Sequence, residues 1–398
     1  MPALRFPEFG GEWEEKRLGD VGEIITGSTP PTNERGHYDG EYLFVSPFDI
    51  QDNRYVENTK TTLTKSGFLN GRKVKKGSSL FVCIGSTIGK VAQAKHDCTT
   101  NQQINSVIST SNNDDFVFSL LQFHSSRIQK LQAEQAVPIL NKTTFSNYVL
   151  SIPTISEQNK IANFLTAVDE KLQALKKKKA LLEQYKKGVM QKIFSQELRF
   201  KDENGNDFAD WEVKRLGDAF YCEKGKGLSK EKLSATGINE CILYGELYTK
   251  YSEVVFSIVS KTNENEGLRS QIGDLLIPCS TTTTGIDLAN ITALNKEGVL
   301  LGGDITVLRS SKKINNIFYA YYLSNHKKEE IASYAQGSTI VHLYFGHIKD
   351  MAIDLPSFLE QQKIANFLTN IDEKINQQQN QIEKVSHYKK GLLQQMFC

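Results

Sequence analysis

This sequence has few of the features that mark secreted, membrane or metal-binding proteins. None of its six cysteines forms a Cys-x-x-Cys pair, which disfavours a zinc site and a disulfide framework and suits reduced thiols. No apolar run approaches the ~18 residues of a membrane span. The N-terminus is rich in glutamate and has no apolar segment of the kind found in secretory signals. We therefore expect a cytoplasmic protein.

Strong net charge is also missing, because the 398 residues carry a formal charge of only +2. A basic tail for holding nucleic acid is excluded, whereas a locally patterned site is not. Segment 157–194 carries +5, and segments 1–156, 195–359 and 360–398 carry 0, −4 and +1. The one basic run, Lys176–Lys179, fits either a solvated helix face or a contact with phosphate or a partner.

A long internal repeat is the most informative feature. The sequence EQNKIANFLTAVDEKL begins at Glu157, and EQQKIANFLTNIDEKI begins at Glu360, with twelve of sixteen positions identical. Trp13 and Trp211 open a second repeated string that ends in Arg-Leu-Gly-Asp. The segments between these repeats differ almost wholly in sequence. A period near 200 residues is far too long for a solenoid and indicates a duplicated domain with two divergent inserts.

The repeated ends are predicted to be long helices that form a coiled coil, since apolar residues recur at alternating steps of four and three. Two ordinary amphipathic helices, each covering its own domain, are the alternative. The predicted seam of the first helix is Ile161, Leu165, Val168, Leu172, Leu175, Lys179, Leu182, Lys186, Val189 and Ile193. The predicted seam of the second is Ile364, Leu368, Ile371, Ile375, Gln378, Ile382, Val385, Lys389, Leu392 and Met396.

Polar residues on this seam favour antiparallel pairing. Parallel helices would bury Lys179 and Gln378 against apolar partners, which is costly. Antiparallel helices with aligned ends place these two side chains opposite each other as a polar pair. Lys186 and Lys389 stay on the seam near its ends, where their ammonium groups are expected to reach water along apolar stems.

The inserts read as mixed α/β. Strands are expected at 42–45, 79–84, 90–94 and 106–108, then at 241–243, 274–278 and 305–308, with helices at 116–132 and 317–333. The predicted architecture is therefore mixed α/β, with two globular domains at 1–156 and 195–359. Two helices, at 157–194 and 360–398, join them as an antiparallel coiled coil with pseudo-twofold symmetry.

Catalytic motifs are incomplete. Residues 85–90, GSTIGK, resemble a phosphate loop but have too few residues between the glycines, so a tight glycine-flanked turn is expected. Glu14 with Lys16 and Glu212 with Lys214 form half of a metal-dependent nuclease signature, yet a shared structural strand is the favoured reading. Since no metal-ligand spacing or methyltransferase motif occurs, we expect no catalytic residue, no metal and no cofactor in this chain.

Short polar side chains cluster in both inserts and are the candidate DNA contacts. Asn and Gln can read adenine edges, and Ser and Thr can hold phosphates or bases. The ordinary alternative is loop solvation. The candidates are Ser86, Thr87, Lys90, Asn101, Gln102, Gln103 and Asn105 in the first insert and Thr281, Thr282 and Thr283 in the second.

Phe164 and Phe367 lie one step before seam leucines, off the seam, and are expected to face a partner subunit. The predicted docking and coiled-coil set is Phe164, Leu165, Leu172, Lys179, Phe367, Leu368, Ile375 and Gln378.

These repeated frames, EQxKIAxFLxxxDEK followed by Tyr-Lys-Lys-Gly, resemble the DNA specificity subunit of type I restriction-modification enzymes. The strings STIGK at Ser86 and NQQIN at Asn101 are similar to strings frequent in that family's target recognition domains.

The resemblance implies that each insert binds one half of a bipartite DNA target. The helices would then act as spacer and docking site for two modification subunits, which carry S-adenosylmethionine. Restriction and motor subunits, with ATP and Mg²⁺, would join for cleavage. A protein scaffold that does not bind DNA and a metal-dependent nuclease remain as alternatives.

Overall fold

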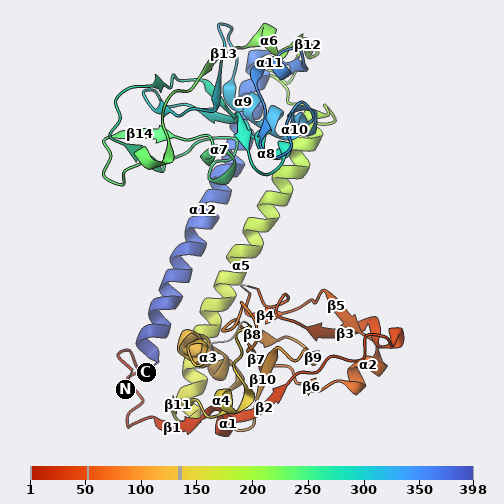
Figure 1. Cartoon of the computed structure of the whole chain (residues 1–398), viewed down its shortest axis with the longest axis vertical. Helices are drawn as coiled ribbons and strands as arrows, with labels where there is room; N and C mark the ends of the chain where they lie inside the picture. Colours follow the sequence, from red (N-terminus) through yellow and green to blue (C-terminus); the bar gives the residue numbers. More distant parts are fainter. Residues whose placement is uncertain (1, 52, 133–136, 398) are drawn as a thin grey trace. The chain divides into compact units, whose positions relative to one another are not determined.

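The computed structural model describes residues 2–51, 53–132 and 137–397. Two compact units divide the chain. The first comprises Met1–Lys179 and Gln378–Cys398, and the second comprises Ala180–Gln377. Each unit therefore contains parts of both long helices, α5 (Ile155–Phe194) and α12 (Phe358–Met396) (Figure 1).

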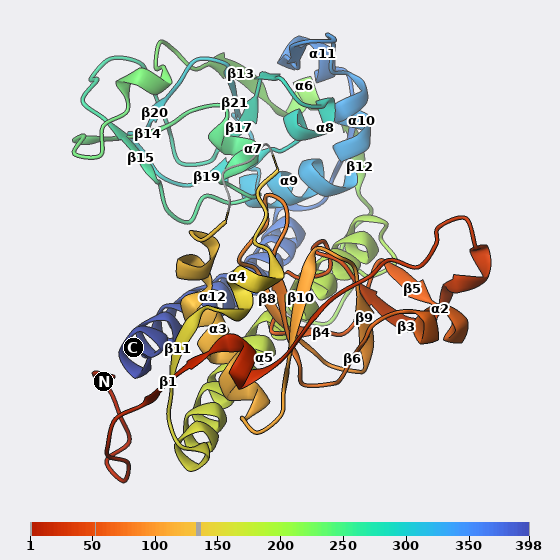
Figure 2. The same ribbon diagram turned by 60° about the horizontal axis from the view of Figure 1, so that its bottom comes forward.

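The first unit is built from a five-stranded sheet, a four-stranded sheet and a two-stranded ribbon, in the orders β2-β10-β7-β8-β4, β5-β3-β9-β6 and β1-β11 (Figure 2). Its strands are β1 (Glu14–Arg17), β2 (Gly22–Thr26), β3 (Tyr38–Val45), β4 (Tyr55–Val56), β5 (Thr61–Leu63), β6 (Lys73–Val74), β7 (Ser79–Val82), β8 (Val91–Ala94), β9 (Cys98–Thr100), β10 (Ile104–Ser109) and β11 (Val149–Ile152). Its shorter helices are α1 (Leu18–Val21), η1 (Arg35–His37), α2 (Lys65–Asn70), α3 (Asp114–Gln129) and α4 (Lys142–Ser146).

The second unit has two four-stranded sheets, β13-β21-β17-β19 and β15-β14-β20-β16, and the ribbons β12-β23 and β18-β22. Its strands are β12 (Glu212–Arg215), β13 (Tyr221–Lys224), β14 (Asn239–Ile242), β15 (Ser260–Thr262), β16 (Leu268–Arg269), β17 (Asp274–Pro278), β18 (Ser280–Thr281), β19 (Thr292–Leu294), β20 (Leu300–Leu301), β21 (Ile305–Arg309), β22 (Val341–His342) and β23 (Ala352–Leu355). Its helices are α6 (Leu216–Ala219), η2 (Lys230–Lys232), α7 (Glu246–Thr249), α8 (Gly285–Leu288), α9 (Asn316–Tyr321), the π-helical η3 (Tyr322–His326), α10 (Lys328–Ser333) and α11 (Phe345–Ile348).

The two units share one topology although their inserts differ in sequence. The order β13-β21-β17-β19 repeats β2-β10-β7-β8, and β15-β14-β20-β16 repeats β5-β3-β9-β6. A parallel pair recurs at the equivalent place, between β3 and β9 and between β14 and β20, and the first unit has a further parallel pair, β4 with β8. The mixed α/β duplication expected from the sequence is therefore confirmed. The expected helix at 317–333 is wrong in one detail, because the π-helical η3 interrupts it.

The repeated Trp-Glu-x-Lys strings lead into short strands, β1 and β12, as predicted for a structural strand shared by both units. Strand β1 pairs with β11, and β12 pairs with β23. In each copy lysine and glutamate form an exposed ion pair along the strand, Lys16–Glu14 and Lys214–Glu212, both at 3.0 Å.

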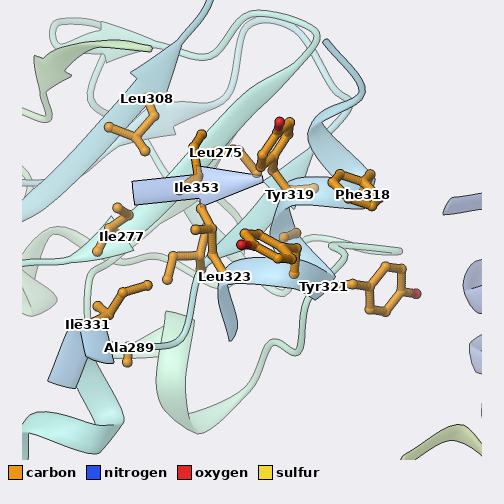
Figure 3. Close-up of a cluster of buried hydrophobic side chains, with 14 of the residues drawn as sticks. Leu275, Ile277, Ala289, Leu308, Phe318, Tyr319, Tyr321, Leu323, Ile331 and Ile353 are labelled. Carbon is orange, nitrogen blue, oxygen red and sulfur yellow. The ribbon is translucent and has the colours of Figure 1, made fainter. Parts of the chain in front are cut away.

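Each unit's hydrophobic core includes the start of one long helix and the end of the other. In the first unit Leu165 and Leu392 belong to the same core as Trp13. In the second unit Leu368 and Ile193 belong to the core that contains Leu275, Tyr319 and Ile353, part of which Figure 3 shows. The helices are thus integral to both folded units and do not merely connect them.

The predicted coiled-coil seam is confirmed by burial, since none of its twenty residues is exposed. Its antiparallel direction is visible within each unit, because the early part of one helix contacts the late part of the other.

A buried ion pair holds the helices together in the first unit. The ammonium of Lys389 lies 2.6 Å from the Asp169 carboxylate. It also donates a hydrogen bond to the Gln122 side-chain oxygen at 2.6 Å. Arg54 of the globular part reaches the same aspartate at 3.3 Å. Burial lowers the pKa of Lys389, and the charge of Asp169 opposes this effect. The buried ammonium is therefore stable only while the aspartate stays within contact distance.

The second unit repeats this pair at the equivalent positions of the duplication. Lys186 lies 2.8 Å from the Asp372 carboxylate and 3.0 Å from that of Glu253. Burial opposes the charge of Lys186, but Glu253 and Asp372 reverse the effect and raise its pKa. The expectation that Lys186 and Lys389 extend into water is wrong, because carboxylates off the seam bind both ammonium groups inside the protein.

The predicted polar pair of Lys179 and Gln378 is not satisfied as expected. Gln378 is buried on the seam, and its side-chain oxygen accepts no hydrogen bond from the described residues. The polar contacts that define the helix pairing are therefore the lysine–aspartate pairs.

Among the described residues, no helix combines the length and apolarity needed to cross a membrane. The described cysteines, Cys83, Cys98, Cys222, Cys241 and Cys279, are free thiols, and Cys398 lies outside the described residues.

We predict that Asp169→Ala lowers the free energy of unfolding of the first unit by about 3–5 kcal/mol, because it leaves Lys389 buried without its counter-charge. The double variant Asp169→Leu with Lys389→Leu should lose less, since neither charge then remains. Urea unfolding measures both effects. Exposed Glu170→Ala is the control and should change stability by about 0.5 kcal/mol at most. A double variant less stable than the single one would contradict this account.

Candidate nucleic-acid interface

Three loops of the first unit meet at one end of its five-stranded sheet. The loop at 85–90 follows β7, the loop at 101–103 follows β9, and the loop at 27–29 follows β2. The Cys83 amide donates to the Gln103 carbonyl at 2.8 Å, and the Ser28 amide donates to the Thr100 carbonyl at 2.9 Å. The structure thus brings the candidate residues at 86–90 close to those at 101–103, both within the first insert.

The first loop is the tight glycine-flanked turn predicted from its sequence. Gly85 and Gly89 have φ values of 96° and 94°, in the left-handed region that glycine adopts without strain. Ser86 at its tip is exposed, and Thr87 and Lys90 are half-buried. The Lys90 ammonium donates to the Ile50 carbonyl at 3.3 Å.

The second loop presents an ordered pair of amides and one exposed amide. The Asn101 side chain donates to the side-chain oxygen of Gln103 at 2.9 Å and accepts from the Gln103 backbone amide at 3.1 Å. Gln102 is exposed, and its oxygen accepts a hydrogen bond from Thr29 at 2.6 Å, which leaves its NH₂ donors for other groups.

Asn105 is not part of this surface, which corrects its selection as a DNA contact. Only 2% of the residue is exposed. Its side-chain oxygen accepts from Thr26 at 2.7 Å, and its NH₂ donates to the Cys83 sulfur at 3.2 Å. Burial raises the pKa of Cys83 to about 12, so this thiol stays protonated. Asn105 therefore links two strands inside the sheet.

The second unit has an equivalent polar pair but different loops. The sulfur of Cys279, after β17, lies 3.1 Å from the Thr306 hydroxyl on β21, as Cys83 and Asn105 pair after β7 and on β10. In place of the amides at 101–103, the loop before β21 reads Gly302-Gly303-Asp304. The frame is retained while the groups offered to a ligand change.

Only part of the threonine run at 281–283 is accessible to a DNA ligand. Thr281 is buried, and its hydroxyl lies 2.8 Å from that of Thr283, so its selection as a DNA contact is wrong. Thr283 is exposed but its hydroxyl also hydrogen-bonds to the Asp287 carboxylate. Thr282 is exposed and remains the best placed of the three.

An aromatic and cationic cluster beside this run was missed in the sequence. Strand β22 pairs with β18, which puts His342 opposite Ser280. The ring of Tyr344 stacks on His342 with centroids 5.7 Å apart, and the Lys224 ammonium lies 5.6 Å from the Tyr344 ring. The spacing His-x-Tyr-x-x-His at 342–347 was the available signal. These side chains combine stacking surface with donors, as nucleic-acid contacts require.

No cluster of three or more His, Cys, Asp or Glu side chains suited to a metal ion occurs in the part of the chain that the structure describes.

The selected docking residues are mostly covered by the chain itself. Phe164 packs edge-on against Phe6 with centroids 6.0 Å apart, and Phe367 packs likewise against Phe200 at 5.4 Å. Both rings are half-buried, so the chain itself covers part of each, and their role in docking a partner stays a prediction. The seam residues Leu165, Leu172, Leu368 and Ile375 are buried or half-buried, so they fit the coiled coil and not an open docking face.

A repeated Leu-Arg-Phe string accounts for these contacts of Phe164 and Phe367. It begins at Leu4 and at Leu198 and was not among the features predicted from the sequence. Arg5 binds the Glu157 carboxylate at 2.7 Å, and Arg199 binds that of Glu360 at 3.0 Å. Each arginine fixes the following phenylalanine over the start of a long helix. The exposed aromatic residues on the helices are instead Tyr185 and Tyr388, which are 53% and 56% exposed and occupy equivalent positions of the repeat.

Comparisons with known proteins agree with this duplicated architecture. A family model described as "Type I restriction modification DNA specificity domain" matches residues 10–184 and again 209–385. The type I restriction enzyme MjaVIII specificity subunit of Methanocaldococcus jannaschii is 23% identical over 409 residues, covering 99% of this chain and 93% of that protein.

Two solved structures share the fold. The crystal structure of a type I restriction-modification S subunit from M. genitalium has a TM-score of 0.66 and 18% identity, covering 100% of this chain and 99% of the other. A chain from a type I R-M system, described for complex assembly and conformational transition, has a TM-score of 0.53 and 16% identity, covering 97% of each chain.

We predict unequal effects of two amide truncations on the free energy of unfolding. Asn105→Ala removes both hydrogen bonds of a buried amide and should lower the free energy of unfolding by about 1–3 kcal/mol. Exposed Gln102→Ala should change it by about 0.5 kcal/mol at most. Urea unfolding followed by circular dichroism measures both. Equal losses would show that the two residues do not divide into a structural amide and a surface amide.

Proposed function

Because this chain belongs to the family of type I restriction-modification DNA specificity domains, we propose that it is the specificity subunit of such a complex and binds DNA in a sequence-specific way. Each globular domain, at 1–156 and 195–359, reads one half of a bipartite target. The observation that carries the proposal is the pair of matching frames with divergent loops: amides at 101–103 are replaced by Gly302-Gly303-Asp304, while the cysteine–polar pairs beneath them are retained.

The first domain is proposed to read its half-site through Ser86, Gln102 and their neighbours. A glutamine can bind an adenine edge through both its oxygen and its NH₂ group, and a serine hydroxyl can contact a base or a phosphate. Thr29, which already donates to Gln102, orients that amide. Asn101 and Gln103 would support the loop or read a neighbouring base together.

The second domain offers different chemistry and should therefore read a different sequence. Thr282 supplies a hydroxyl, and Tyr344 and His342 supply ring faces and donors beside it. Lys224, close to the Tyr344 ring, would contact the backbone. An asymmetric bipartite target follows from these two unlike surfaces.

The chain is the non-catalytic member of its complex. Two modification subunits are proposed to bring S-adenosylmethionine, and restriction and motor subunits to bring ATP and Mg²⁺, in the cytoplasm. We propose that the modification subunits dock on exposed faces of the long helices that include Tyr185 and Tyr388, since these tyrosines are more than half exposed whereas Phe164 and Phe367 are half-buried. A scaffold that does not bind DNA is the remaining alternative, and it would lack salt-dependent binding to a random-sequence duplex.

Exchanging residues 21–150 for the equivalent insert of a relative should change one half of the methylated DNA motif and leave the other half unchanged. The reason is that the two reading surfaces belong to different compact units. Sequencing of methylated adenines, with the full complex expressed in a host, gives the motif. The matched control exchanges the second insert and should change the opposite half. Changes in both halves after either exchange would show that the domains read jointly.

The antiparallel helices are proposed to fix the gap between the half-sites. The seam from Ile161 to Ile193 spans about 48 Å at 1.5 Å per residue. Seven residues inserted in each helix, after Leu175 and after Gln378, keep both seams continuous.

The doubly extended chain should recognise the same half-sites with a gap longer by about one to three base pairs, because each heptad adds about 10 Å. It should also bind more weakly where the added rotation of the duplex is not absorbed. Motif mapping measures the gap. Lengthening one helix alone is the control and should abolish binding, since the seam then loses register. An unchanged gap in the doubly extended chain would leave the helices a docking role only.

A further inference from the structure

A cavity of about 660 Å³ lies within the second unit, beside the loop that connects β20 to β21. Gly303 and Asp304 of that loop contribute to its lining. The rest of the lining comes from the segment 228–233, around η2, and from the segment 243–250, which includes α7. The volume lies within the range of ~300–1,000 Å³ that is typical of ligand sites. The polar side chains of this lining are therefore candidates for contact with a ligand.

Asp304 occupies the place that Gln103 occupies in the first unit. The Cys279 amide donates a hydrogen bond to the Asp304 carbonyl at 2.8 Å, and the Cys83 amide donates to the Gln103 carbonyl at 2.8 Å. Each of the two acceptor residues directly precedes an interior strand of its sheet, β21 or β10. The duplication thus places a carboxylate where the loop of the first unit has an amide.

The carboxylate of Asp304 is held in place and keeps one accepting oxygen. Its Oδ2 accepts a hydrogen bond from the Ser280 hydroxyl at 3.0 Å. Asp304 is half-buried, and in the part of the chain that the structure describes its Oδ1 accepts no hydrogen bond. Its φ of 59° lies in the left-handed region, which aspartate tolerates better than most other residues with a side chain. The side chain is therefore an oriented acceptor in the lining of the cavity.

The other acidic side chains in the described lining have different surroundings. Glu246 is only 5% exposed, and its carboxylate binds the Lys250 ammonium at 2.7 Å. Glu231 is exposed on η2 and does not belong to the loop that corresponds to 101–103. Asp304 alone among these three combines a place in that loop with a fixed orientation.

The two equivalent loops offer hydrogen-bonding groups of opposite kind. The Gln103 side-chain oxygen accepts from Asn101 at 2.9 Å, and its NH₂ group is a donor. An ionised carboxylate such as that of Asp304 only accepts. In the major groove of DNA the donors are amino groups, N4 of cytosine and N6 of adenine. Adenine also presents the acceptor N7 beside its amino group, which would repel a carboxylate, so cytosine is the better partner.

Basic side chains near the loop can hold DNA close to this carboxylate. The Lys226 backbone amide donates to the Leu301 carbonyl at 3.1 Å, so the exposed Lys226 lies beside the loop. Lys230 is also exposed and lines the cavity. Contacts of these ammonium groups with phosphates would offset the repulsion between the phosphates and Asp304.

We propose that Asp304 determines one base of the second half-site by accepting a hydrogen bond from the amino group of a cytosine. This inference rests on the proposed function and adds to it a specificity-determining residue and the base that it selects. Cytosine is preferred to thymine at that position, because thymine has the acceptor O4 where cytosine has its amino donor.

The test uses the complex of the full chain with its modification subunits and measures affinity for duplexes in which each position of the second half-site is varied in turn. The wild-type complex should prefer cytosine to thymine at one position by about 5- to 150-fold, the range for one base contact. Asp304→Asn keeps the side-chain volume and tolerates the same φ, yet it should lose most of this preference at that position alone. Glu231→Gln is the matched control. It removes one negative charge from the same cavity and should keep the wild-type preference.

A second measurement tests the amino group itself. The cytosine is replaced by 2-pyrimidinone, which lacks only the amino group. The affinity of the wild-type complex should then fall by about 5- to 150-fold more than that of the Asp304→Gly complex, since the weakened base pairing affects both complexes alike. Glycine adopts a left-handed φ without strain, so this variant removes the carboxylate and keeps the loop conformation. Thermal unfolding of both Asp304 variants shows that they are folded.

The outcomes separate the inference from the proposed function. The same differential loss at an adenine, probed with unsubstituted purine, would support Asp304 as the reading residue and assign adenine as its partner. Folded Asp304→Asn and Asp304→Gly complexes that keep the wild-type base preference at every position of the second half-site would overturn the inference. An equal change of preference in Glu231→Gln would overturn it as well. Failure of the wild-type complex to distinguish its target from scrambled DNA would instead overturn the proposed function.

Discussion

A buried lysine–aspartate pair, present once in each unit, is the interaction on which the rest of this structure depends. Asp169 with Lys389 and Asp372 with Lys186 occupy equivalent positions of the repeat and join the two long helices. An apolar seam alone tolerates several registers, whereas a buried charge is stable only opposite its partner. Each pair therefore fixes both the register and the antiparallel direction. Because both helices enter both cores, the same contact also connects each globular part to the helices.

Each globular part adds its own charged group to this pair, and the two groups differ in sign. Arg54 approaches the aspartate in the first unit, and Glu253 approaches the lysine in the second. The divergent inserts thus add different side chains to the duplicated frame. The loops differ in the same way, because the first unit has amides at 101–103 where the second has Gly302-Gly303. Retained frame positions and variable loops are what a protein needs to change its DNA target without refolding.

Much of the architecture could be predicted from the sequence, because repeats and helical periodicity depend on local patterns. The seam, the helix direction and the paired Trp-Glu-x-Lys strands are of this kind. Predictions from residue type failed where burial decides. Asn105 and Thr281 have the chemistry of DNA contacts but lie inside the fold, and Phe164 is half-buried against Phe6, which is remote in sequence. The partner of Lys389 was missed because Asp169 lies beside the predicted seam and not on it.

The central claim is that two unlike reading surfaces on one duplicated frame specify one DNA target. Mapping of methylated adenines in the genome of a host that expresses this chain with its modification subunits tests it most directly. The account predicts one asymmetric motif made of two different half-sites that are separated by a gap of constant length and unspecified sequence. A single continuous motif, two identical half-sites, or methylation that does not depend on this chain would contradict it.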